Sequence, residues 1–105
     1  AMAQRFYTEV LQLPGAAPFF AEPEICSQIL DLHLKSPSML CIIPLQDWLS
    51  SSGSLRRENP NDEQINVPAN PKHYWRYRMH LSVQQLLSQS GFNAELASAI
   101  KSSGR

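Results

Sequence analysis

The chain has 105 residues and a formal net charge of zero, because nine lysines and arginines balance nine aspartates and glutamates. This length suits a single domain, and a hydrophobic content of 43% excludes intrinsic disorder by composition. The balanced charge argues against a general nucleic-acid-binding protein, and no apolar run approaches the roughly 18 residues that a membrane-spanning helix needs.

The start of the chain and its cysteines bear on the compartment in which the protein works. No basic segment followed by an apolar stretch opens the chain, so we predict no signal peptide, and residues 1–3 are interpreted as a cloning addition. Cys26 and Cys41 lie among apolar residues without metal-ligand spacing. We therefore expect two small buried thiols in a reducing compartment, and a cytoplasmic location.

Residues 4–36 are expected to be helical. A short helix over Gln4–Leu11 should end before Pro14, and a longer helix should begin with Pro23 in its first turn and stop before Pro37. The longer helix has an apolar face at helical spacing, formed by Ile25, Ile29 and Leu32, with a neighbouring stripe of Cys26, Leu30 and Leu34.

Met39–Ile43 is a run of five apolar residues without alternation, and Pro44 follows it. Continuous apolar character indicates a strand that is buried on both faces, as in a parallel sheet. No second strand of this kind is present in the chain, so we expect the partner strands to lie outside it. An unpaired apolar strand also favours self-association with a second copy of the chain.

The second half of the chain reads as a long loop followed by helices. Residues 50–72 show no apolar period, which predicts a functional or disordered segment. An aromatic-rich stretch precedes a helix near Leu81–Leu87, which Ser82 should cap, and Asn93 is expected to cap a final helix. The isolated chain should therefore be mainly α-helical with one short strand.

Few side chains suggest chemistry on their own. Asp62 and Glu63 read as solvated surface charge. Asp47 follows the predicted strand, where α/β folds place functional residues, but a helix-capping or ion-pairing role is favoured for it. The spacing of the three histidines, His33, His73 and His80, predicts no zinc site, and we expect neither a metal nor a cofactor.

The segment Tyr74–Arg78 has two interpretations. Its aromatic rings suit stacking on sugars or bases, and Arg76 and Arg78 suit hydrogen bonds to hydroxyls or phosphates. Alternatively, Trp75 and Tyr77 pack into the core while the arginines point outward, as a two-residue period allows. For Trp75 the sequence favours the core interpretation.

Two stretches resemble the 4-alpha-glucanotransferases of glycoside hydrolase family 77, the amylomaltases. Pro37–Asp47, with its Met-Leu-Cys-Ile-Ile-Pro-Leu-Gln-Asp sequence, resembles the last barrel strand of that family. Ile65–Arg78 resembles its closing signature, which has Asn-x-Pro followed by an aromatic and arginine cluster. The Asn-Pro-Lys-His-Tyr-Trp-Arg-Tyr-Arg form is closest to the branch that contains the plant disproportionating enzyme.

The resemblance implies a fold and a reaction. Residues 1–105 would form a single C-terminal segment of a (β/α)8 TIM barrel, with 38–43 as the last strand, 50–72 as a loop at the rim of the substrate site and 73–105 as closing helices. Such enzymes transfer α-1,4-glucan chains through a covalent glucosyl intermediate on an aspartate, with a glutamate as acid and base. These carboxylates precede the matched segment in the family, so no catalytic residue is assigned here.

The resemblance also implies substrate contacts. Asn66 and Pro68 match the Asn-x-Pro motif at the rim of the active site, and an asparagine amide both donates to and accepts from sugar hydroxyls. The residues expected to support this site are Gln46, Asp47, Trp75 and Arg76.

The partners expected from this reading are a maltodextrin or glycogen-like glucan and the remainder of the same polypeptide, with no nucleic acid and no membrane. The alternative is a free-standing helical module that binds nucleic acid or a peptide through Tyr74–Arg78. A small helical structural domain without a ligand is the third possibility. The isolated chain is expected to be inactive, because it lacks the catalytic carboxylates.

Overall fold

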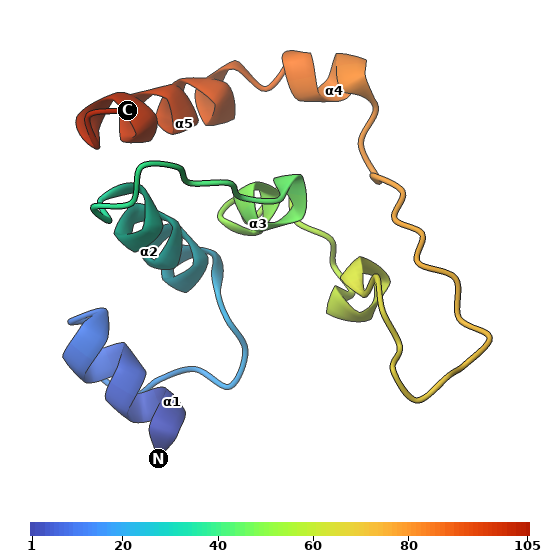
Figure 1. The fold of residues 1–105 in the computed structure, drawn as a ribbon. Coiled ribbons are helices and arrows are strands. Elements are labelled where there is room, and N and C mark those ends of the chain that lie inside the picture. Colours follow the sequence, from blue (N-terminus) through green and yellow to red (C-terminus); the bar gives the residue numbers. More distant parts are fainter.

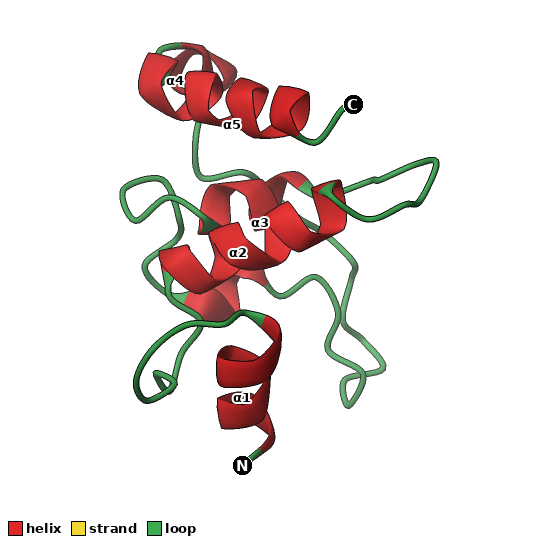
Figure 2. Ribbon diagram, turned by 90° about the vertical axis from the view of Figure 1, so that its left-hand side faces the viewer, coloured by secondary structure: helices red, strands yellow, loops and turns green.

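The computed structural model describes all 105 residues and contains helices and loops but no strand. Figure 2 shows three tiers, with α1 at one end, α2 and α3 in the middle, and α4 with α5 at the other end. The helical elements are α1 (Met2–Arg5), a π-helical turn (Phe6–Val10), α2 (Pro23–Leu34), α3 (Leu45–Ser50), a 3-10 turn (Pro60–Glu63), α4 (Val83–Leu87) and α5 (Ser90–Ser102).

The predicted long helix is confirmed as α2. Pro23 occupies its first turn, where the missing N–H costs nothing, and Glu24 complements the positive end of the helix dipole. At the other end Lys35 follows the last helical residue and pairs with Asp31 at 2.6 Å. The buried residues of α2 are Leu30 and Leu34, so the stripe beside the predicted main face carries the core contact.

The N-terminal helix also forms, from Met2 through Val10, and it ends before Pro14. Gln12 adopts φ 54°, the left-handed conformation that turns the chain away. The side chain of Gln4 then ties the following loop to the helix, because it donates to the carbonyl of Gly15 at 3.1 Å and accepts from the amide of Ala17 at 2.7 Å.

The expected short strand is wrong for this chain. Met39–Ile43 forms no ladder, because a strand needs a partner whose N–H and C=O groups pair with its own. Three of its side chains are accordingly exposed, Met39 at 92%, Leu40 at 75% and Ile42 at 90%, while Cys41 and Ile43 are half-buried. Arg105 fixes the start of this segment instead, since its guanidinium donates to the carbonyls of Leu34, Ser36 and Ser38.

The C-terminal helices confirm one predicted cap and correct another. Ser82 accepts from the backbone N–H of Gln85, whose side chain accepts in return from the N–H of Ser82, so α4 begins with a complete capping box. Asn93 does not cap α5, which already begins at Ser90. Its side chain instead donates to the carbonyl of Leu86 at 3.1 Å and so ties α5 to α4.

The core is small. Its five buried residues are all leucines: Leu11, Leu30, Leu34, Leu49 and Leu55. The chain exposes 8163 Å², against roughly 5,900 Å² for a compact monomer of 11.8 kDa. The two cysteines are free thiols and are half-buried rather than buried, which corrects that expectation. None of the helices is long and apolar enough to cross a membrane.

We expect the isolated 105-residue chain to self-associate through Met39–Ile43, because exposed extended apolar backbone pairs readily with a second copy. Sedimentation velocity should show a mass of at least about twice that of the monomer. Ile42→Lys should restore the monomer, whereas Val83→Lys, at an exposed position on α4, should not. A wild-type chain that sediments as a monomer would contradict this prediction.

Candidate functional site

The candidate site lies on the long segment between the 3-10 turn and α4, which runs along one edge of the molecule in Figure 1. Asn66 and Pro68 are both exposed on it. The amide of Asn66 makes no hydrogen bond within the chain, so its donor and acceptor groups face solvent. The first part of this segment, residues 64–76, is called the rim loop below.

Gln46 braces the entrance to the rim loop. From the first turn of α3, its Nε2 donates to the backbone carbonyl of Glu63 at 2.9 Å and to Oε2 of the Glu63 carboxylate at 3.1 Å. Because Glu63 ends the 3-10 turn, these two bonds fix the chain three positions before Asn66. Of the two residues expected to support the loop from α3, Gln46 therefore contacts its base.

Arg57 contacts both ends of the rim loop. Its Nε lies 3.2 Å from Oε1 of Glu63, close enough for an ion pair but not aligned for a hydrogen bond. On the other side the guanidinium lies 5.5 Å from the centre of the Tyr77 ring, and its Nη2 donates to the carbonyl of Arg78. The side chains of Arg57 and Glu63 are only 19% and 25% exposed.

The hydroxyl of Tyr77 is buried in this cluster without a hydrogen-bond partner. Burial raises the pKa of Tyr77 above its ordinary 10.0, the neighbouring Glu63 carboxylate raises it further, and Arg57 opposes them. Tyr77 therefore keeps its proton in the folded chain at a pH at which an unfolded chain would begin to lose it.

We expect the chain to lose stability as the pH rises above 10, and Tyr77→Phe to weaken that loss. The phenol of Tyr77 ionises at a lower pH in the unfolded chain than in the folded chain. A rise in pH above the pKa of the unfolded chain therefore favours unfolding, until the pH also exceeds the pKa of Tyr77 in the folded chain. Urea midpoints measured from about pH 8 to about pH 11 test this. Tyr74→Phe, at an exposed ring, is the control and should keep the wild-type pH dependence; an unchanged slope in Tyr77→Phe would refute the assignment.

A second contact crosses the rim loop closer to Asn66. Nε2 of His73 lies 2.8 Å from the backbone carbonyl of Ile65, and a carbonyl only accepts, so this nitrogen carries the proton. Between them, Asn70 Oδ1 accepts from the backbone N–H of Lys72 and closes a local turn. Asn66 and Pro68 lie within the bend that these contacts define.

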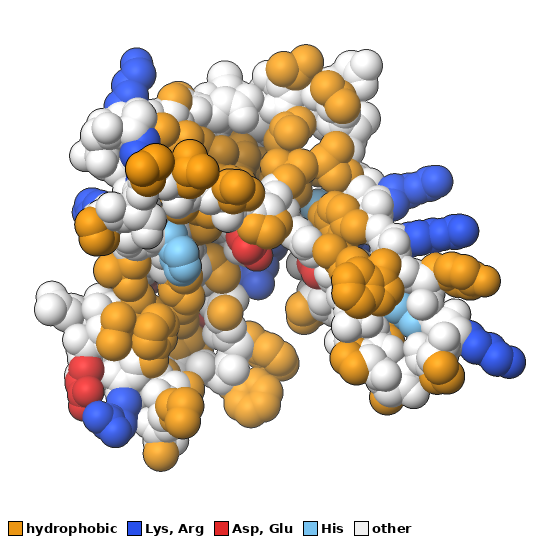
Figure 3. All heavy atoms as spheres, in the orientation of Figure 1, with side chains coloured by type: hydrophobic (Ala, Val, Ile, Leu, Met, Phe, Trp, Pro, Cys, Tyr) orange, Lys and Arg blue, Asp and Glu red, His pale blue; other side chains and the backbone are white.

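The aromatic segment after the bend is largely exposed, which makes the core interpretation of Trp75 wrong: its side chain is 73% exposed. Arg76 lies over the ring of Tyr74, at 5.3 Å from the ring centre. Figure 3 shows Lys and Arg side chains projecting from the edge along which this segment runs, among exposed hydrophobic side chains. Only Tyr77 turns inward, toward Arg57.

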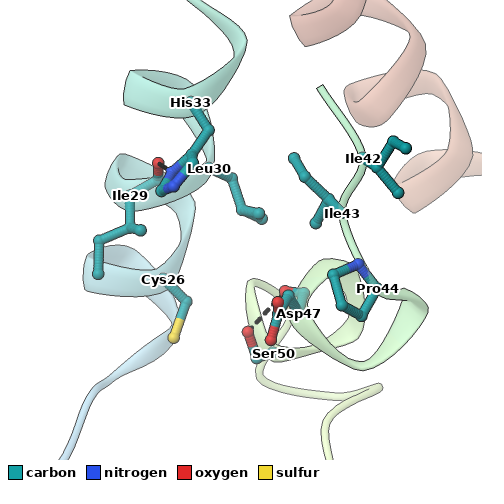
Figure 4. Close-up of a pocket in the computed structure, with 9 residues that line it drawn as sticks. All are labelled: Cys26, Ile29, Leu30, His33, Ile42, Ile43, Pro44, Asp47 and Ser50. Carbon is teal, nitrogen blue, oxygen red and sulfur yellow. Dashed lines mark hydrogen bonds between the residues drawn. The ribbon is translucent and has the colours of Figure 1, made fainter. Parts of the chain in front are cut away.

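Asp47 faces away from the rim loop. It lines a hollow of about 260 Å³ between α2 and the segment that leads into α3, together with Ile29, Ile43 and Ser50 (Figure 4). The lining is mostly apolar, and Asp47 is its sole carboxylate. Hydrolysis or transfer at a glycosidic bond needs two carboxyl groups, and this hollow supplies one.

Sequence reasoning missed the Arg57 cluster. Glu63 was interpreted as a solvated charge, but it is paired and three-quarters buried. The sequence offered only a weak signal for this cluster: charged residues lie on both sides of Pro60 within a stretch that has no apolar periodicity. Contacts between Arg57 and Tyr77 span twenty positions, and no local pattern reports such a separation.

Comparison with known proteins matches residues 1–84 to the glycoside hydrolase 77 family, described as 4-alpha-glucanotransferase. The chain is 38% identical over 101 residues, 96% of its length, to the 4-alpha-glucanotransferase DPE2 of Oryza sativa subsp. japonica. It is 38% identical over 72 residues (68% of its length) to the 4-alpha-glucanotransferase of Chlamydia muridarum and 36% over 81 residues (76%) to that of Chlamydia caviae. These matches cover 11%, 14% and 15% of the respective relatives, and no solved structure matches the chain.

Proposed function

Because the chain belongs to the 4-alpha-glucanotransferase family, we propose that it is part of a longer enzyme that transfers α-1,4-glucan chains between maltodextrins. The observation that carries the proposal is the 38% identity to the rice relative, which extends over almost the whole chain, including the rim loop. The matches are to 4-alpha-glucanotransferases, and nothing favours a nucleic-acid- or peptide-binding module.

The proposed place of the chain is the last part of a (β/α)8 barrel, with Met39–Ile43 as a barrel strand. Two observations support it. The segment is apolar and pairs with no strand, and the side chains of Met39, Leu40 and Ile42 are exposed, so it is available to neighbouring strands. The chain also exposes about 2,300 Å² more than a compact monomer of its mass, which suits a piece that packs against a larger body. The proposed partner is therefore the remainder of the parent polypeptide.

The proposed reaction has two steps. In the first, a carboxylate replaces the leaving glucan at the anomeric carbon while an acid protonates the departing hydroxyl oxygen. In the second, the hydroxyl of an acceptor glucan loses its proton to the same acid–base group and displaces the carboxylate. Both carboxyl groups lie outside this chain in the proposal, because the family resemblance places them before the matched segment, and no cofactor takes part.

The contribution of the chain is to bind and orient the glucan. The free amide of Asn66 donates to one sugar hydroxyl and accepts from its neighbour, and Pro68 restricts the backbone beside it. Gln46 holds the base of the rim loop, while Trp75 and Arg76 are exposed at its C-terminal end. A supporting role for Asp47, which faces the other side of α3, and a cytoplasmic location stay predictions.

Incubation of the parent polypeptide with maltotriose tests the proposal. Transfer predicts glucose together with maltodextrins longer than the substrate, resolved by anion-exchange chromatography. The isolated 105-residue chain should yield neither product, because it lacks the acid and the nucleophile. A parent polypeptide without transfer products would refute the proposed function, and an active 105-residue chain would refute the assignment of the catalytic groups to the rest of the parent.

A further inference from the structure

One side chain joins the two ends of the rim loop. Glu63 directly precedes the loop and Tyr77 directly follows it, and Arg57 contacts both. The same guanidinium also donates to the carbonyl of Arg78. Thirteen residues, 64–76, are thus enclosed between contacts made by a single arginine.

The cluster uses the particular chemistry of a guanidinium. Arginine combines three features that lysine does not offer together. Its plane can lie over an aromatic ring, its charge can face a carboxylate, and a separate N–H can donate to a carbonyl. The two carboxylate oxygens of Glu63 have different partners: Oε1 faces Arg57, and Oε2 accepts a hydrogen bond from Gln46. Because Arg57 and Glu63 are mostly buried, water screens their attraction less than at an exposed ion pair.

We propose that Arg57 is a positioning residue that sets the place of Asn66 at the substrate by closing the rim loop at its base; this rests on the proposed function. Joining the ends of a loop removes most of the conformations that its middle can adopt. An amide that hydrogen-bonds a sugar must be held close to one place, since a displacement of about 1 Å costs up to about 100-fold in rate.

The effect of removing Arg57 is separable from unfolding. The contact between His73 and Ile65 closes the bend without Arg57, and the two bonds from Gln46 still hold Glu63. The bend therefore forms in an Arg57 variant, but its position relative to the exit at Tyr77 is no longer fixed. In such a variant Asn66 keeps its amide, but the position of that amide relative to the substrate is no longer fixed.

The test is a double-mutant cycle in the full-length parent polypeptide, with kcat/KM for maltotriose disproportionation as the readout. Arg57→Ala is expected to lower kcat/KM about tenfold. In an Asn66→Ala background the same substitution should lower it less than about twofold further, because there is no amide left to misplace. Additive losses, or full activity of Arg57→Ala, would overturn the inference.

Two further variants separate position from charge and from general stability. Arg57→Lys keeps the charge opposite Glu63 but not the stacked plane, and its activity should fall between those of wild type and Arg57→Ala. Arg56→Ala is the matched control, because Arg56 donates to the carbonyl of Ala21 and does not contact the rim loop. It should retain wild-type activity; an equal loss in both arginine variants would overturn the inference.

Hydrogen exchange of the purified parent gives a readout independent of turnover. Backbone amides of residues 64–76 should exchange faster in Arg57→Ala than in wild type, and at the wild-type rate in Arg56→Ala. An unchanged exchange rate in Arg57→Ala would overturn the inference by itself. An inactive wild-type parent would instead refute the proposed function, so the two failures are distinguishable.

Discussion

Asn66→Ala in the parent polypeptide is expected to lower kcat/KM for maltotriose disproportionation by about 5- to 150-fold. The alanine removes one donor and one acceptor, and each hydrogen bond between neutral groups contributes about 0.5–1.5 kcal/mol. Two such bonds give about 1–3 kcal/mol, which converts to that range of rates. The amide is available for this role because it makes no hydrogen bond within the chain.

Two variants sharpen this prediction. Asn66→Asp keeps an acceptor but loses the N–H donor, so its activity should fall below that of wild type. The sugar oxygen that accepted from the amide loses its hydrogen bond, and repulsion between that oxygen and the negative carboxylate adds to the loss. Asn61→Ala is the matched control, since Asn61 is also an exposed asparagine and lies in the 3-10 turn, before the rim loop. Chromatographic rates for the three variants decide the matter. Wild-type activity in Asn66→Ala would remove the proposed substrate contact.

Local signals predicted the helices well, because their causes lie within a few residues of each end. Proline in the first turn and a lysine after the last turn set the bounds of α2, and Ser82 with Gln85 sets the start of α4. Gly104 follows α5 with φ 81°, the conformation that glycine adopts without strain at a helix end. Asn93 misled because an asparagine suits a cap as readily as it suits the α4 contact that it makes.

The apolar run Met39–Ile43 shows where pattern and structure separate. A run without alternation reports that both faces are suited to burial, but it does not supply the partner that a ladder requires. In this chain the segment forms no strand, contrary to the short strand expected, and Met39, Leu40 and Ile42 are exposed. The pattern describes an environment that the 105 residues do not themselves provide.

The candidate site divides in the same way. Asn66, Pro68 and Gln46 were identified through a motif resemblance, which needs only consecutive residues. Arg57 was missed, and the inward packing considered for Tyr77 did not identify its partner, because the contact between them joins segments that are distant in sequence. The burial of Glu63 was missed for the same reason: a charged residue beside Asp62 and Pro60 has the local pattern of a solvated turn.

Leu49→Ala is expected to cost the isolated chain about 3 kcal/mol of unfolding free energy, because the substitution removes buried methyl groups and leaves a cavity. Leu49 is 1% exposed, which makes it the most completely buried side chain, and it lies on α3, which packs against α2. With five buried residues, the chain has little free energy in reserve, so a loss of this size should abolish most of its helical circular dichroism at 25 °C.

Leu87→Ala is the matched control, because Leu87 is 74% exposed on α4 and its replacement removes little buried surface. Its unfolding free energy should stay within about 0.5 kcal/mol of wild type. Urea unfolding followed by circular dichroism compares the three chains. If Leu49→Ala and Leu87→Ala unfold at the same urea midpoint, the five leucines do not form the core of the isolated chain. Its helices must then depend on self-association. In that case the urea midpoint would change with protein concentration.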